Sequence, residues 1–433
     1  MEEATPQMTF PNTTNLASFT PESQLIMLNE ITEPKFLSSY KHNGASGVRE
    51  ELAIIYHEVT HWADTVGTIW GNEYLKTAYS AYDVMPVLDR SGSEASYHHF
   101  LRLHDANRRL KHDDYYRVMR KHQPDHSLSH PWRISFSSGV EFNGSGLPDE
   151  NRPICFVKFG NNPSDELLVR QPLSIASLLE TTATWSELST HFHLVGTLNE
   201  DEKFVETHML TQRFGKNLYT PELTVYSSPV HLLAHHTRMK NAAEAYHFSA
   251  LLALVCLNLV GSHFSRLKVP GSFNAWGARI SAFKRNESRP FAFMVICENG
   301  PKWEPGMPPW VWIDAALAAS GLPSFQEILS HAVDVLTADE QHCNRAEMAV
   351  SQRYMRMLGA KWLAYRRDQK DSAINIRHLS DGDLILPAMY DAEGNVFSVF
   401  GKGFDTSLFD LETMFDAEAE LRSRVRNFRN ACR

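Results

Sequence analysis

The sequence predicts an α+β fold, in which a small antiparallel sheet lies among helices and is followed by a mainly helical part. Residues 132–170 contain short stretches of strand-forming residues separated by Asn, Gly, Pro and Asp, a pattern typical of an antiparallel meander. After Pro172, helical patterns dominate over residues 174–189, 229–260, 312–337 and 340–370. A content of 43% hydrophobic and 21% charged residues is that of a globular chain that can bury a core.

The clearest single element is a helix over residues 48–66. Apolar residues recur there at spacings of three and four, which places them on one face of a helix. They are Leu52, Ile55, Val59, Trp62 and Val66. Gly67 follows directly and can end the helix, so we expect an amphipathic helix whose apolar face packs into the core.

Other segments give weaker patterns. Residues 1–45 are rich in Pro, Thr, Ser and Asn, and we expect a loose lead-in with one short edge strand at Gln24–Ile31. A basic, solvated helix is expected within residues 93–121, and a loop within residues 271–290. Residues 384–399 have the pattern of a hairpin, and the C-terminal tail that of a charged helix.

Charge and cysteine content narrow the classes of partner and compartment. With 42 basic and 51 acidic residues the net charge is −9, so the chain as a whole lacks the positive surface of a protein whose partner is nucleic acid or an anionic membrane. The longest apolar run, residues 250–261, is far shorter than the roughly 20 residues that span a bilayer. Five scattered cysteines without a CxxC pair, and an N-terminus without a secretory pattern, predict reduced thiols and a cytoplasmic protein.

One motif carries recognisable chemistry: residues 57–61 read HEVTH, an HExxH sequence on the predicted helix. Residues four apart lie on the same side of a helix, so His57 and His61 can direct two imidazole nitrogens at one metal ion. Glu58 lies beside them and can take a proton from water. Chance predicts only about 0.07 such motifs in a chain of this composition, although an ordinary structural helix with two histidines remains the alternative.

The motif resembles that of the HExxH zinc metallopeptidases, the zincins. The resemblance covers this helix and one further segment. The glycine and third histidine of the metzincin pattern HExxHxxGxxH do not follow His61 at that spacing, which excludes this branch. The resemblance therefore points to the gluzincin branch, in which a glutamate from a later helix is the third zinc ligand. It also implies a zincin-like catalytic domain over residues 46–265, after a lead-in at 1–45 and before a helical domain at 266–433.

Three glutamates are candidates for the third ligand. Glu180 fits the gluzincin pattern best, because Ala183 and Thr184 follow one turn later and leave room for another helix. Glu244 is also flanked by alanines, and Glu73 lies only twelve residues beyond His61. The choice among the three stays open in the sequence.

Further residues could assist such a site. Tyr246, and beside it His247, could donate a hydrogen bond to a developing oxyanion, although aromatic residues in such a helix more often belong to the core. Asp64 could orient a ligand, although an exposed acid near a helix end is the commoner interpretation.

The resemblance implies a cytoplasmic, Zn²⁺-dependent peptidase acting on a peptide or protein, with Glu58 as general base and Tyr246 as an assisting residue. Neither nucleic acid nor a membrane is expected as partner, and the oligomeric state stays undetermined. Two alternatives remain: a non-catalytic metal-binding interaction protein, and a zinc hydrolase that cleaves a non-peptide amide.

Overall fold

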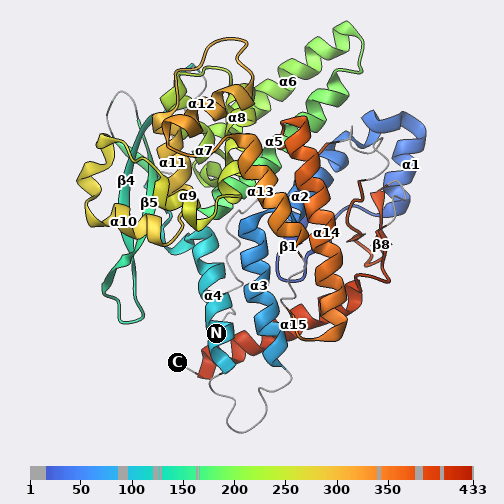
Figure 1. Ribbon diagram of the computed structural model, residues 1–433. Helices are drawn as coiled ribbons and strands as arrows, with labels where there is room; N and C mark the ends of the chain where they lie inside the picture. Colours follow the sequence, from blue (N-terminus) through green and yellow to red (C-terminus); the bar gives the residue numbers. More distant parts are fainter. Residues whose placement is uncertain are drawn as a thin grey trace. The chain divides into compact units, whose positions relative to one another are not determined.

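The chain folds into helices and two small sheets (Figure 1), which confirms the α+β class. The computed structural model describes residues 16–85, 96–119, 126, 129–161, 164, 166–338, 343–375, 384–399 and 404–431. Two compact units are present. The first contains Leu110–Leu329 and Lys370–Ala373, and the second contains Thr13–Arg109, Ser330–Gln369 and Ile374–Arg433. They differ from the three consecutive segments that the sequence suggested, because the second unit draws on both halves of the chain.

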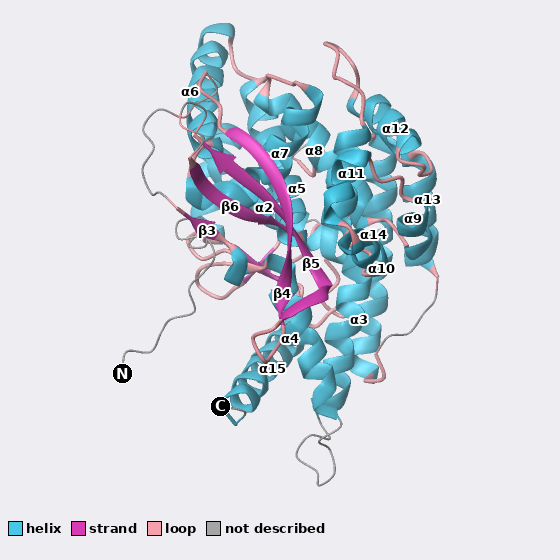
Figure 2. Ribbon diagram, turned by 90° about the vertical axis from the view of Figure 1, so that its left-hand side faces the viewer, coloured by secondary structure: helices cyan, strands magenta, loops and turns pink. Residues whose placement is uncertain are grey.

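The first unit contains the predicted antiparallel meander. Its strands run in the order β3-β6-β5-β4 (Figure 2), and all pairs of neighbours are antiparallel. Their bounds are β3 Arg117–Val118, β4 Arg133–Phe142, β5 Pro148–Gly160 and β6 Leu167–Leu173. The central β5 strand buries a continuous run of side chains from Ile154 to Val157, as expected for a strand covered on both faces.

Helices make up the rest of the first unit. Their bounds are α5 Ile175–Val195, α6 Glu200–Leu218, α7 Thr224–Thr237, α8 Ala242–Leu257, α9 Gly261–Arg266, α10 Ala278–Arg285, α11 Arg289–Asn299 and α12 Pro309–Ala319. Helix α8 is buried along almost its whole length, and it packs against α5, α7, α11 and α12. Short 3₁₀ segments add η4 Asp113–Tyr115, η5 Pro221–Leu223 and η6 Gly271–Trp276.

Two expectations for this unit need correction. The helical pattern over residues 229–260 is interrupted, since Arg238 adopts the left-handed conformation that ends α7. The predicted loop at residues 271–290 contains α10, which packs on β5. The sequence pattern did not indicate this short helix, because Gly277 precedes it, Asn286 follows it, and only Ala282 and Phe283 are buried.

The second unit contains the predicted HExxH helix. Its helices are α1 Glu33–Asn43, α2 Arg49–Val66, α3 Ile69–Val84, α14 Ala346–Gln369 and α15 Leu411–Ala431, with η1 at Gly44–Val48. Two further helices belong to both units, α4 Tyr97–Lys111 and α13 Phe325–Thr337. Helix α2 packs against α3 and α14, and its burial of Leu52, Ile55, Val59, Trp62 and Val66 confirms the predicted stripe.

The N-terminal segment is more ordered than predicted. Strands β1 Ser18–Thr20 and β2 Leu25–Met27 join β7 Met389–Tyr390 and β8 Val396–Phe397 in the order β1-β2-β7-β8. The expected strand is thus present, but it is an interior strand and the lead-in assignment is wrong from residue 16 onward. Its parallel partner β7 lies more than 360 residues later, beyond the reach of local sequence patterns. The predicted hairpin at residues 384–399 is confirmed as β7 and β8.

Helices α2 and α14 approach at their backbones. A Cβ atom on Gly359 would collide with the Val66 carbonyl, and one on Gly67 with the carbonyls of Ala63 and Gly359. Only glycine permits so close an approach, so these two positions place the end of α2 directly against α14.

No described helix is long and apolar enough to cross a bilayer. Four cysteines, Cys155, Cys256, Cys297 and Cys343, are free and buried, and burial raises the pKa of each thiol. Cys432 lies outside the described residues.

A packed aromatic cluster joins the sheet of the first unit to α7. Trp132 lies with its ring centroid 5.0 Å from that of Phe159 and 5.6 Å from that of His231. A ring nitrogen of His231, Nε2, is 2.9 Å from the Leu218 carbonyl oxygen, to which its N–H donates. Burial lowers the pKa of His231 to about 4, so this imidazole is neutral in the folded protein at neutral pH.

We predict that His231 contributes to acid unfolding. The unfolded chain protonates this histidine near its ordinary pKa of about 6.5, so stability should fall between about pH 6.5 and 4, by up to about 3 kcal/mol. His231→Gln retains an N–H donor but does not titrate, and urea unfolding at a series of pH values should show a shallower decline. The exposed His208→Gln is the matched control. An unchanged pH slope in His231→Gln would contradict the assignment.

Candidate metal centre

Helix α2 presents His57, Glu58 and His61 on its less buried side. All three side chains are half-buried, whereas Val59 and Trp62 of the same helix are completely buried. The acidic residues of the first turn and the glycine after the last turn favour a helix of this length. The motif is therefore held on a rigid element that is anchored by its opposite face.

The two imidazoles converge at their Nε2 atoms. These nitrogens are 3.2 Å apart, and the ring planes cross at 81° with centroids 4.8 Å apart. Two nitrogens bound to one tetrahedral zinc at 2.0–2.1 Å lie about 3.3 Å from each other. The two Nε2 atoms are thus at hydrogen-bond distance, and the same spacing is that of two ligands of one ion.

Glu180 lies on α5 in a half-buried position, and its Oε2 atom is shielded from solvent. The helix begins with a capping box, in which the Ser174 hydroxyl accepts from the Ser177 N–H and the Ser177 side chain accepts from the Ser174 N–H.

The other two glutamate candidates lie elsewhere. Glu73 is exposed on α3, and Glu244 is in the first turn of α8, where its N–H donates to the Asn241 side chain. The choice of Glu180 among the three alternatives, and its role as a ligand, stay predictions.

The donor set suits zinc. Two imidazole nitrogens and one carboxylate are the three protein ligands of many catalytic zinc sites, in which a fourth position admits water. Calcium and magnesium prefer sites made of oxygen ligands. The residues present therefore fit a zinc ion with one position open.

The hydroxyl group of Tyr246 forms a hydrogen bond with the backbone. Its side chain is buried, and its hydroxyl donates to the Tyr226 carbonyl oxygen over 3.0 Å. Burial raises the pKa of this phenol, and the charges of Glu187 and Glu180 act in the same direction. The hydroxyl could donate to an oxyanion only after giving up its present bond, and the geometry gives no support to the catalytic role expected for it.

His247 forms a polar cluster that the sequence did not reveal. Its Nε2 atom is 3.4 Å from Asp371 Oδ1, and its ring stacks on Trp185 with centroids 4.5 Å apart. The indole N–H of Trp185 donates to the same oxygen over 2.9 Å. Burial alone would raise the pKa of Asp371, but the contacts with His247, the Ala373 N–H and Trp185 outweigh burial and lower it. No sequence signal pairs residues 124 positions apart.

Asp64 is a buried ion-pair partner, and the interpretation as an exposed acid is wrong. Its Oδ1 atom accepts from Arg366 Nη1 over 2.6 Å, and both side chains are at most 1% exposed. Arg366 belongs to α14, so the pair joins this helix to α2 one turn beyond His61. The carboxylate therefore fixes the helix that carries the motif.

Comparisons of the chain with protein-family models, with curated proteins and with solved structures found no match. The case for a metal centre consequently depends on the geometry of these side chains.

We predict that zinc binding requires Glu180 as well as the histidine pair. Glu180→Ala should weaken zinc binding at least about a hundredfold, because two histidines alone provide neither the charge nor the coordination number that holds the ion. Glu73→Ala and Glu244→Ala remove the same side chain from other helices and serve as controls. Calorimetric zinc titration of the three variants measures the effect. Loss of binding in Glu244→Ala but not in Glu180→Ala would contradict the ligand set.

We also predict that the Asp64–Arg366 pair stabilises α2. Arg366→Met should lower the free energy of unfolding by about 3–5 kcal/mol, since it leaves a buried carboxylate without its cation. The double variant Asp64→Leu/Arg366→Met should recover much of this loss. Urea unfolding measures both, with Arg367→Met as the control for a partly exposed arginine on the same helix. Equal losses in the single and double variants would show that packing, not charge, dominates here.

Proposed function

We propose that the protein is a zinc-dependent peptidase of the gluzincin type, with His57, His61 and Glu180 as the metal ligands and Glu58 as the general base. The observation that carries the proposal is the 3.2 Å separation of the two Nε2 atoms on one helix, with Glu58 beside His57. The free, buried cysteines agree with a reducing compartment such as the cytoplasm.

The chemistry follows from the residues. A zinc ion bound at this site would lower the pKa of a water molecule toward ~7 and polarise the carbonyl of the scissile bond. Glu58 is adjacent to His57 on the half-buried side of α2, where its carboxylate can accept the proton of the attacking water. The same carboxyl group then donates that proton to the leaving amine. His57, His61 and Glu180 orient the reaction and do not exchange protons.

Tyr246 has no catalytic role in this mechanism. His247 lies next to Tyr246 on α8, and its ring is paired with Asp371. The substrate class, a peptide or protein, comes from the resemblance of the motif. A zinc hydrolase that cleaves a non-peptide amide would use the same residues.

We predict that Glu58→Gln separates metal binding from hydrolysis. The amide keeps the shape of the side chain but cannot accept a proton, so turnover should fall at least about a hundredfold while zinc content is unchanged. The measurement is cleavage of a peptide library by the zinc-loaded protein, followed by mass spectrometry, with zinc content determined on the same samples.

Glu73→Gln is the matched control, because it makes the same exchange at an exposed helical position. Wild-type turnover in a verified Glu58→Gln preparation would assign the base to another residue. Stoichiometric zinc without cleavage of peptides or simple amides by the wild-type protein would favour the non-catalytic, metal-binding alternative.

A further inference from the structure

Helix α6 packs against the rest of the first unit on one side only. Its C-terminal half buries Leu210 and places the ring centroid of Phe214 4.9 Å from that of Tyr246 on α8. Figure 1 shows α6 projecting from the helices of this unit, with α5 beside it. Residues 200–209 are all exposed except the half-buried Glu206. The N-terminal half of α6 is therefore largely open to solvent.

Large apolar side chains gather on the exposed side of this helix. Phe204 is 76% exposed, Val205 is 52% exposed and Met209 is 60% exposed. Successive residues of an α-helix are about 100° apart around its axis, which places these three side chains opposite Leu210 and Phe214. The helix is thus apolar on two opposite sides, and the first unit covers one of them. Clustered exposed apolar side chains of this kind mark an interaction surface.

The charges on the exposed side of α6 differ between the two ends of the helix. Asp201 is one of three acidic residues in the first turn, and Lys216 is the basic residue of the last turn. Both are exposed and, by the same angular spacing, lie on the side that carries Phe204 and Met209. They are about 22 Å apart along the helix axis. A helix side that is acidic at one end and basic at the other is complementary to a copy of itself in the opposite direction.

We propose that α6 is a self-association surface, on which a second copy of this chain packs its own α6 in antiparallel orientation across a two-fold axis. Such an interface uses the same surface on both copies. Phe204, Val205 and Met209 of the two copies cover one another near the axis. Asp201 of each copy then lies near Lys216 of the other.

The charge pattern favours a second copy over other occupants of this surface. In a parallel pair the three acidic residues of each first turn would meet and repel one another. An anionic lipid surface would repel the same acidic turn, and a partner of uniform charge would match only one end of the helix. The proposal does not depend on zinc binding or on hydrolysis.

The small size of the surface sets the strength of the interaction. Stable protein interfaces bury about 1,200–2,000 Å² in total, and three large apolar side chains from each copy supply only part of this area. We therefore expect a reversible equilibrium between monomer and dimer, with a dissociation constant in the micromolar range.

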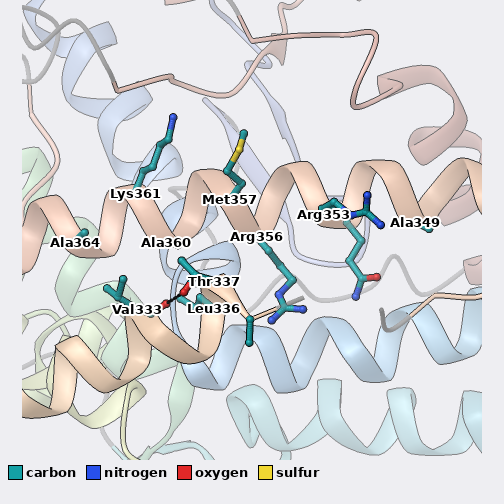
Figure 3. A pocket seen from close by; sticks show the side chains of 12 residues that line it. Val333, Leu336, Thr337, Ala349, Arg353, Arg356, Met357, Ala360, Lys361 and Ala364 are labelled. Carbon is teal, nitrogen blue, oxygen red and sulfur yellow. Dashed lines mark hydrogen bonds between the residues drawn. The ribbon is translucent and has the colours of Figure 1, made fainter. Parts of the chain in front are cut away.

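The test is sedimentation velocity of the full-length protein over a concentration range of about 1 to 200 µM. We expect a dimer whose fraction rises with concentration. Met209→Gln should weaken dimerisation at least about tenfold, because it places an amide at the centre of the apolar contact. Met357→Gln is the matched control, since Met357 is also an exposed methionine on a helix. It lies on α14 beside the groove between α13 and α14 that Figure 3 shows, which alanines and basic residues line.

A charge reversal tests the antiparallel orientation. Lys216→Glu should weaken dimerisation at least about tenfold, since it places a carboxylate near Asp201 of the other copy. The double variant Asp201→Lys/Lys216→Glu should recover most of the affinity, because the two charges are exchanged and attract again. Lys361→Glu makes the same charge change at an exposed position of α14 and is the control.

All these variants alter exposed side chains, so unchanged circular dichroism should accompany them. A monomer throughout the concentration range would overturn the proposal. Unchanged dimerisation in Met209→Gln would also overturn it, by placing the interface elsewhere. A double variant as weak as Lys216→Glu would overturn the antiparallel orientation of the two helices.

Discussion

The buried ion pair between Asp64 and Arg366 is the constraint on which the arrangement of the second unit depends. Burying two charges is costly, and the pair is tolerable only because its atoms meet at 2.6 Å. Together with the contact of Gly359 against the end of α2, it sets both the distance and the register between α2 and α14. A rotation of α2 about its axis would break the ion pair. The pair therefore fixes the direction in which His57 and His61 point.

The candidate metal centre shows how a polar site can be held on an apolar scaffold. Each potential ligand is half-buried on a helix whose opposite face is completely buried. In α5 this anchoring begins with the serine capping box, six residues before Glu180. Side chains on such helices lose little further freedom on binding an ion, which is the physical basis of a preorganised site. Tyr246 shows the opposite case, because its hydroxyl is engaged with a backbone carbonyl in the core.

Helix α14 has two faces with different roles. One face supports α2 through a charged residue and a glycine, and the other lines a groove with alanines and cations. Small residues serve both purposes: glycine lets two backbones approach, and alanine leaves space along the groove.

The sequence by itself determined the features that depend on local periodicity. It predicted α2 with its apolar stripe, the meander of β4 to β6 and the hairpin of β7 and β8, because spacings of two or three to four residues report directly on strands and helices. The pairing of His57 with His61 was also local. Tertiary structure alone decided that β2 is an interior strand paired with β7 and that Asp64 is buried against Arg366. These facts depend on contacts between residues far apart in the chain, and no local pattern encodes which distant partner a polar side chain will meet.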